Sequence, residues 1–200
     1  NPRLFADQIT YVVNHAKDRI IFIDQTFVPI VEKLVDRLPK DLIYVILCNK
    51  GDMPDTSLPK PLCFEELISS EASTISWPNL DERAASSLCY TSGTTGNPKG
   101  VLYSHRSILL HTFGMLTFAA DVGLTPSSTV LPVVPLFHAN AWGLPFAVPL
   151  VGAKLVFPGA ALDGASLFSL MDREKVKAAW GVPTIWLGLL AEMRKQKRKE

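Results

Sequence analysis

The sequence predicts an α/β protein with a mainly parallel sheet flanked by helices. Short β-branched apolar runs alternate along the chain with longer segments whose apolar residues recur at helical spacing. Of the 200 residues, 48% are hydrophobic and 20% are charged, which is the balance of a folded protein rather than a disordered one. Strands that alternate with helices favour right-handed βαβ units, in which helices cover a parallel sheet.

The first half of the chain contains two helix–strand alternations. Helical periodicity predicts helices over residues 4–17 and 28–38, and apolar runs predict strands over residues 19–24 and 42–48. Residues 49–61 hold one glycine and three prolines, so we expect a loop there.

The second half repeats the alternation. The expected strands are residues 87–91, 129–134, 154–157 and 177–182. The expected helices are residues 104–119, a proline-interrupted stretch that runs to residue 151, residues 162–173, and a last helix from Pro183 onward. Proline suits the first turn of a helix, where its missing N–H leaves no bond unmade.

Charge and cysteine content restrict the classes of partner. A net charge of +1 argues against nucleic acid or an anionic membrane as the main partner. Residues 122–153 carry no Asp, Glu, Lys or Arg, but five prolines make this stretch a buried core rather than a membrane span. Three cysteines without a CxxC spacing predict a reducing, cytoplasmic setting.

The segment after the strand at residues 87–91 carries the most chemical information. It reads Thr91-Ser92-Gly93-Thr94-Thr95-Gly96-Asn97-Pro98-Lys99-Gly100. Glycines let the backbone approach an anion, hydroxyls donate hydrogen bonds, and the lysine adds a positive charge, a set that suits a polyphosphate. The spacing is neither the Walker A pattern nor a dinucleotide fingerprint. The plain alternative is a polar surface loop.

This segment resembles the phosphate-loop signature of the adenylate-forming superfamily, which contains acyl-CoA synthetases, luciferases and peptide-synthetase adenylation domains. Four further blocks, residues 101–106, 135–143, 150–154 and 181–186, look most like the fatty-acyl-CoA synthetase branch, including its relatives that act on short thioether acids. The resemblance covers nearly the whole chain. It implies that residues 1–200 are part of the large N-terminal adenylation domain, without its C-terminal part and the mobile C-terminal domain.

The resemblance implies a two-step ligase reaction that uses ATP, Mg²⁺ and coenzyme A. A carboxylic acid attacks the α-phosphate of ATP, pyrophosphate leaves, and coenzyme A then displaces AMP to give a thioester. Lys99 is the implied catalytic residue, and Thr91 is implied to lie nearest the metal. The implied nucleotide-binding residues in the loop are Thr91, Ser92, Gly93, Thr94, Thr95, Gly96 and Lys99.

A second group of implied site residues lies at 138–142. The resemblance places Ala139 and Trp142 against the nucleotide, makes Trp142 the gate of the acyl tunnel, and makes His138 a wall of the substrate pocket. His138 and Trp142 would share one face if this stretch were helical, because residues four apart are neighbours on a helix. The alternative is that both side chains are core packing.

Other readings of the function stay open. The family's Tyr-Gly-x-Thr-Glu and Thr-Gly-Asp blocks do not occur in the chain, so we expect residues 1–200 alone to be inactive. The parent protein could activate an aryl or thioether acid instead of a medium- or long-chain fatty acid, or it could be a non-catalytic nucleotide-binding module. Related synthetases often dimerise, which makes a homodimer possible.

Overall fold

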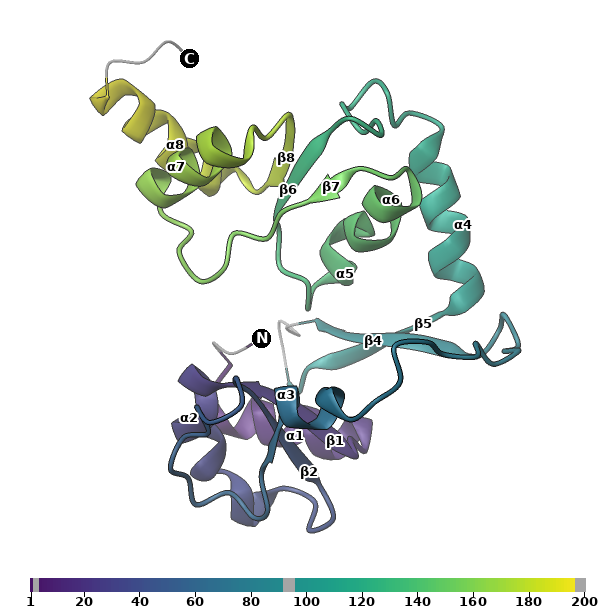
Figure 1. Cartoon of the computed structure of the whole chain (residues 1–200), viewed down its shortest axis with the longest axis vertical. Coiled ribbons are helices and arrows are strands. Elements are labelled where there is room, and N and C mark those ends of the chain that lie inside the picture. The colour runs from purple at the N-terminus through teal and green to yellow at the C-terminus, as the bar shows by residue number, and fades with distance from the viewer. Residues whose placement is uncertain (2–3, 92–95, 197–200) are drawn as a thin grey trace. The chain divides into compact units, whose positions relative to one another are not determined.

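The computed structural model describes residue 1, residues 4–91 and residues 96–196. The chain divides into two compact units (Figure 1). The first comprises Asn1–Leu80 with Tyr90–Gly100, and the second comprises Asp81–Cys89 with Val101–Glu200. The predicted α/β class is confirmed.

The first unit is built on a three-stranded parallel sheet with the order β1-β2-β3. Its strands are β1 (Ile20–Asp24), β2 (Ile43–Leu47) and β3 (Leu62–Cys63). Its helical elements are α1 (Ala6–Ala16), η1 (Gln25–Phe27), α2 (Val28–Glu32), η2 (Val35–Arg37) and α3 (Phe64–Ser69). The predicted strands at 19–24 and 42–48 are therefore confirmed to within one residue at each end.

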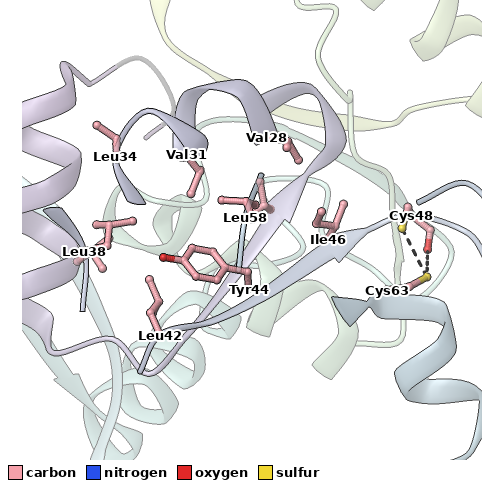
Figure 2. Packing of buried hydrophobic residues seen from close by; sticks show 12 residues of the cluster. Val28, Val31, Leu34, Leu38, Leu42, Tyr44, Ile46, Cys48, Leu58 and Cys63 are labelled. Carbon is pink, nitrogen blue, oxygen red and sulfur yellow. Dashed lines mark hydrogen bonds between the residues drawn. The ribbon is translucent and has the colours of Figure 1, made fainter. Parts of the chain in front are cut away.

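One core fills the space beside this sheet. Tyr44 and Ile46 of β2 are almost fully buried, and they pack with Val31 and Leu34 from the segment around α2 (Figure 2). The single helix predicted over residues 28–38 is wrong, because α2 ends at Glu32 and the short η2 follows. Eleven residues give a marginal helix on their own, so the packing of the leucines decides the local backbone.

The sequence predicted no element for residues 62–69, where the structure has β3 and α3. A strand of two residues is too short to show a period of two. It is recognised only through its pairing with β2, in which Val45 lies opposite Leu62 and Ile46 opposite Cys63.

A two-stranded sheet pairs β4 (Ala85–Thr91) with β5 (Lys99–Ser104). Only residues 92–98 connect the two strands, so they form an antiparallel hairpin. The helix predicted to follow the loop from residue 104 is present from His105 onward, but the sequence predicted no strand at β5, which lies between the loop and this helix. The exposed side chains of β5 give no apolar alternation that could have predicted it.

The second unit contains a three-stranded parallel sheet with the order β7-β6-β8. Its strands are β6 (Thr129–Val133), β7 (Lys154–Leu155) and β8 (Ala178–Gly181). Its helices are α4 (His105–Leu116), α5 (Ala139–Trp142), α6 (Leu144–Leu150), α7 (Gly164–Glu174) and α8 (Pro183–Lys195).

The central strand β6 is buried on both faces, as its continuous apolar run requires. Pro132 lies inside it, although proline cannot donate to a sheet ladder. The register explains this, because β7 pairs with β6 only at Thr129 and Val130, so Pro132 has β8 as its single neighbouring strand. Two clusters of buried side chains, one including Leu144 and the other including Leu167, pack against this sheet and its helices.

No helix in the described part of the chain is both long and apolar enough to cross a membrane.

Candidate functional site

The predicted phosphate loop connects the two strands of the hairpin. Thr91 is the last residue of β4 and is half-buried, and Lys99 is the first residue of β5 and is exposed. Ser92, Gly93, Thr94 and Thr95 lie outside the described residues. Gly96 has a φ of +90°, which glycine adopts without the strain of other residues. The Thr91 hydroxyl lies 3.5 Å from the carbonyl oxygen of Lys99, at the limit of a hydrogen bond.

The base of this loop is anchored by Tyr90. Its hydroxyl lies 2.7 Å from Nδ1 of His15 in α1, and the His15 ring stacks on Tyr11 with centroids 5.1 Å apart. Burial raises the pKa of Tyr90, and the nearby Tyr11 and Asp18 raise it further because they disfavour a phenolate. Tyr90 is therefore a neutral hydrogen-bonding anchor for the residue that precedes Thr91.

Residues 139–142 form a left-handed turn. Ala139, Asn140, Ala141 and Trp142 have φ values of 46°, 49°, 49° and 58°. Each non-glycine residue in this conformation costs roughly 1–2 kcal/mol, so a run of four needs support from its surroundings. His138 precedes the turn in an extended conformation, with φ −115° and ψ 114°, so the condition for the predicted shared helical face with Trp142 is not met.

Asn140 ties this turn to β4. Its side-chain Nδ2 donates a hydrogen bond of 2.9 Å to Oγ of Ser87, and its Oδ1 accepts one of 3.3 Å from Sγ of Cys89. Ala141, the next residue of the turn, is fully buried. These contacts hold the strained backbone in place and make Asn140 a positioning residue that the sequence alone did not reveal.

A hollow of about 430 Å³ lies beside the turn in the second unit. Ala139 and Trp142 line it, whereas His138 does not line it and has an exposed side chain. The other lining residues are Tyr103, Ser107, Ile108, His111, Asn140, Gly143 and Phe146. None of these lining residues is Asp, Glu, Lys or Arg, so the hollow suits the uncharged part of a small molecule.

His111 fixes the far end of the turn. Its Nε2 lies 3.2 Å from the carbonyl oxygen of Trp142, and because a carbonyl only accepts, Nε2 carries the proton. The same ring packs against Gly143, where a Cβ atom would come within 2.6 Å of Cδ2 of His111. The Trp142 side chain remains 41% exposed at the rim of the hollow.

A larger hollow, of about 770 Å³, lies in the first unit. Its lining includes Gln25, Cys48, Asp52, Met53 and Phe64. It contains none of the residues that the sequence singled out for nucleotide or acid binding, so volume alone does not identify the substrate site.

Comparisons with known proteins identify the class. A family model described as AMP-binding enzyme matches residues 1–200, and the chain belongs to this family. The chain is 52% identical to the medium-chain-fatty-acid–CoA ligase of Ectopseudomonas oleovorans, in a match that covers 96% of the chain and 35% of the relative. It is 48% identical to the 3-methylmercaptopropionyl-CoA ligase of Ruegeria pomeroyi, covering 97% of the chain and 36% of the relative.

Other relatives agree with this class. The long-chain-fatty-acid–CoA ligase of Thermus thermophilus is 44% identical over 94% of the chain and 33% of its own length. The crystal structure of an anthranilate CoA ligase in complex with anthranoyl-AMP superposes with a TM-score of 0.80 at 25% identity, over 100% of the chain and 37% of that protein. The chain thus spans about a third of the length of the curated relatives it matches.

Proposed function

We propose that the protein containing this chain is an AMP-forming fatty-acid–CoA ligase for medium- or long-chain acids. The observation that carries the proposal is the uncharged hollow beside Ala139 and Trp142, which suits an aliphatic tail, in a chain of the AMP-binding family. Relatives named as medium-chain and long-chain ligases, at 52% and 44% identity, support the same substrate class. The reaction joins the acid to ATP as an acyl-adenylate and then to coenzyme A.

The loop of the hairpin supplies charge and hydrogen bonds to the phosphates of ATP. The acid carboxylate and the triphosphate are both anions, so neutralisation and positioning dominate the first step. The exposed ammonium of Lys99 is free to reach the departing pyrophosphate, and the loop from Thr91 to Gly96 gives hydroxyl and backbone donors. In this role Lys99 stabilises the charge that develops as the bond to the α-phosphate breaks.

The chemistry of Thr91 fits a magnesium ligand. Its hydroxyl is a hard oxygen that donates only a 3.5 Å contact, so its lone pairs are available to a cation. A bound Mg²⁺ would neutralise the phosphate oxygens. The described residues contain no group of three or more His, Cys, Asp or Glu side chains that could hold a metal. Further ligands would therefore come from elsewhere in the parent protein.

At the second group of residues, Ala139 and Trp142 contact the nucleotide and Trp142 gates the acyl tunnel. His138 does not line the hollow beside Trp142, and its proposed place is at the border of the substrate pocket, near the acid carboxylate. In the parent protein residues 1–200 belong to the N-terminal adenylation domain, and a mobile C-terminal domain completes catalysis. We place the enzyme in the reducing cytoplasm, since all three cysteines are free, and we expect a homodimer.

One specific observation favours a second substrate. The Ruegeria pomeroyi relative is a 3-methylmercaptopropionyl-CoA ligase and is 48% identical, so a short thioether acid is the alternative to a fatty acid.

The test is ATP–pyrophosphate exchange by the intact parent protein with a series of straight-chain acids and with 3-methylmercaptopropionate. A fatty-acid ligase shows exchange that rises with chain length to an optimum. If exchange is highest with the thioether acid, that acid is the substrate instead of a fatty acid. If no acid supports exchange, the proposed ligase function is refuted.

The role of Lys99 is tested in the same assay. We expect Lys99→Ala to lower the exchange rate about a hundredfold or more, which is the usual cost of losing one group that stabilises developing charge. Lys33→Ala, which removes another exposed lysine of the first unit, is the matched control and keeps the parental rate. Equal rates for the two variants would remove Lys99 from the mechanism.

A further inference from the structure

Three sulfur atoms meet at the carboxyl end of the first parallel sheet. Cys48 directly follows β2, Cys63 lies on β3, and Met53 lies in the loop between them. Sγ of Cys48 is 3.5 Å from Sγ of Cys63 and 3.6 Å from Sδ of Met53. Figure 2 shows the side chains of Cys48 and Cys63 directed toward each other at the edge of the core.

Both thiols are poorly solvated. Cys48 and Cys63 are only 7% and 5% exposed. Burial raises the pKa of Cys48, and the neighbouring Cys63 raises it further, because a thiolate there would be desolvated and close to a second thiol. Sγ of Cys63 donates toward the carbonyl oxygens of Cys48 and Asn49, at 3.3 and 3.6 Å. Such thiols react slowly as nucleophiles, whereas a soft metal ion can displace their protons.

The cluster can be reached from two sides. The 770 Å³ hollow is lined by Cys48 and Met53, and a second hollow of about 280 Å³ is lined by Cys63 and Met53. Met53, which is half-buried, thus separates the two hollows. Both hollows border the cluster, so a small ion can approach it without unfolding of the sheet.

The two distances from Sγ of Cys48, to Cys63 and to Met53, are compatible with three-coordination. Metal–sulfur bonds of about 2.3 Å in a trigonal plane place the sulfurs about 4.0 Å apart. The observed separations of 3.5 and 3.6 Å need to widen by only a few tenths of an ångström. Thiol and thioether ligands are soft and favour Cu(I) over Mg²⁺. Structural Zn²⁺ is almost always tetrahedral with four ligands, so a set of three sulfurs favours Cu(I) over Zn²⁺ as well.

We propose that Cys48, Cys63 and Met53 form a binding site for one Cu(I) ion. On binding, one thiol proton is lost to solvent and a copper–thiolate bond forms, while the second cysteine and the methionine coordinate through sulfur lone pairs. The metal keeps its oxidation state, so no oxidant or reductant takes part. One thiolate balances the single positive charge, which leaves the buried site neutral. This site is independent of the proposed ligase reaction.

A disulfide is the competing use of the two cysteines. It would require the Sγ–Sγ distance to shorten from 3.5 Å to about 2.05 Å. It would also give Met53 no role, although its Sδ lies only 0.1 Å farther from Sγ of Cys48 than Sγ of Cys63 does. The three-sulfur arrangement therefore favours the metal over the disulfide.

The test is anaerobic competition for Cu(I) between the intact parent protein and the chromogenic chelator bathocuproine disulfonate, with ascorbate as the reductant. We expect one Cu(I) per chain, an affinity at least a hundredfold weaker in Cys48→Ser and Cys63→Ser, and one about tenfold weaker in Met53→Leu. Cys89→Ser removes the third buried cysteine, outside the cluster, and keeps the parental affinity. X-ray absorption at the copper edge should count three sulfur ligands.

Three results would overturn the proposal. The first is a parental affinity no greater than that of the Cys48→Ser/Cys63→Ser double variant. The second is an unchanged affinity in Met53→Leu, and the third is a count of two sulfur ligands; either of these removes the thioether from the site. Met53→Leu is similar in volume and keeps both thiols, so it remains decisive even where a serine variant unfolds.

Discussion

Replacing Gly143 by alanine tests the packing that holds the left-handed turn. Gly143 has a φ of +79°, a conformation that costs an alanine roughly 1–2 kcal/mol. The new Cβ would also lie 2.6 Å from Cδ2 and 2.8 Å from Nε2 of His111, so the ring must move. Overpacking of this kind costs about 1–3 kcal/mol, and we expect a total loss of about 2–5 kcal/mol in the free energy of unfolding.

Gly152→Ala is the matched control in the same unit. Its φ is +76°, but a Cβ there meets no atom within 4 Å, so only the backbone cost of roughly 1–2 kcal/mol is expected. Urea unfolding of the intact protein, followed by tryptophan fluorescence, gives both values from the midpoint and slope of the transition. The difference between the two variants isolates the contact with His111.

The double variant Gly143→Ala/His111→Ala completes the cycle. Removing the ring makes space for the new methyl group, so the two substitutions together should cost clearly less than the sum of their separate effects. The reasoning is refuted if Gly143→Ala destabilises the protein no more than Gly152→Ala does, or if the two substitutions are simply additive.

Three further substitutions probe the described structure. Glu32 accepts hydrogen bonds from Thr56 and Ser57, which hold its pKa below the ordinary value of 4.5. A carboxyl group whose pKa is lowered in the folded protein stabilises the fold above pH 4.5, and this stabilisation is lost as the pH falls through the folded-state pKa. In an acid titration, Glu32→Gln should therefore lose less stability below pH 4.5 than the parent protein does. Leu167→Ala removes a fully buried side chain and should cost about 2–5 kcal/mol in urea unfolding, whereas a loss below 1 kcal/mol contradicts the packing. Ser104→Ala removes the N-cap of α4 and should cost about 1 kcal/mol, with faster amide hydrogen exchange in the first turn of that helix, and unchanged exchange would disprove the cap.

Local patterns predicted the buried strands well, because β-branched apolar runs are enough to specify them. The strand predicted at residues 129–134 is present as β6, and that predicted at residues 42–48 is present as β2. The same local patterns did not predict strands that are exposed or very short. The strand β5 shows no alternation, and β3 exists only through its pairing with β2. Their formation depends on partners that are distant in sequence, which no local period encodes.

The site was predictable in its residue types and not in its geometry. The run Ala139-Asn140-Ala141-Trp142 suits a right-handed helix by composition, and the structure makes it left-handed. The cause lies in contacts from far along the chain, namely the hydrogen bonds of Asn140 to β4 and the contact between His111 and Gly143. Asparagine, which tolerates positive φ, and the glycine that follows were the only local signals of such a turn.

The hydrogen bond between His15 and Tyr90 has a practical consequence for anyone who shortens this protein. A truncated version that starts after residue 16 would discard the imidazole and leave a half-buried phenol facing water at the point where β4 turns into the loop. The hairpin would then lack the hydrogen bond that holds the end of β4, and nucleotide affinities measured on the truncated protein would not represent the intact site. Recombinant designs should therefore begin upstream of α1.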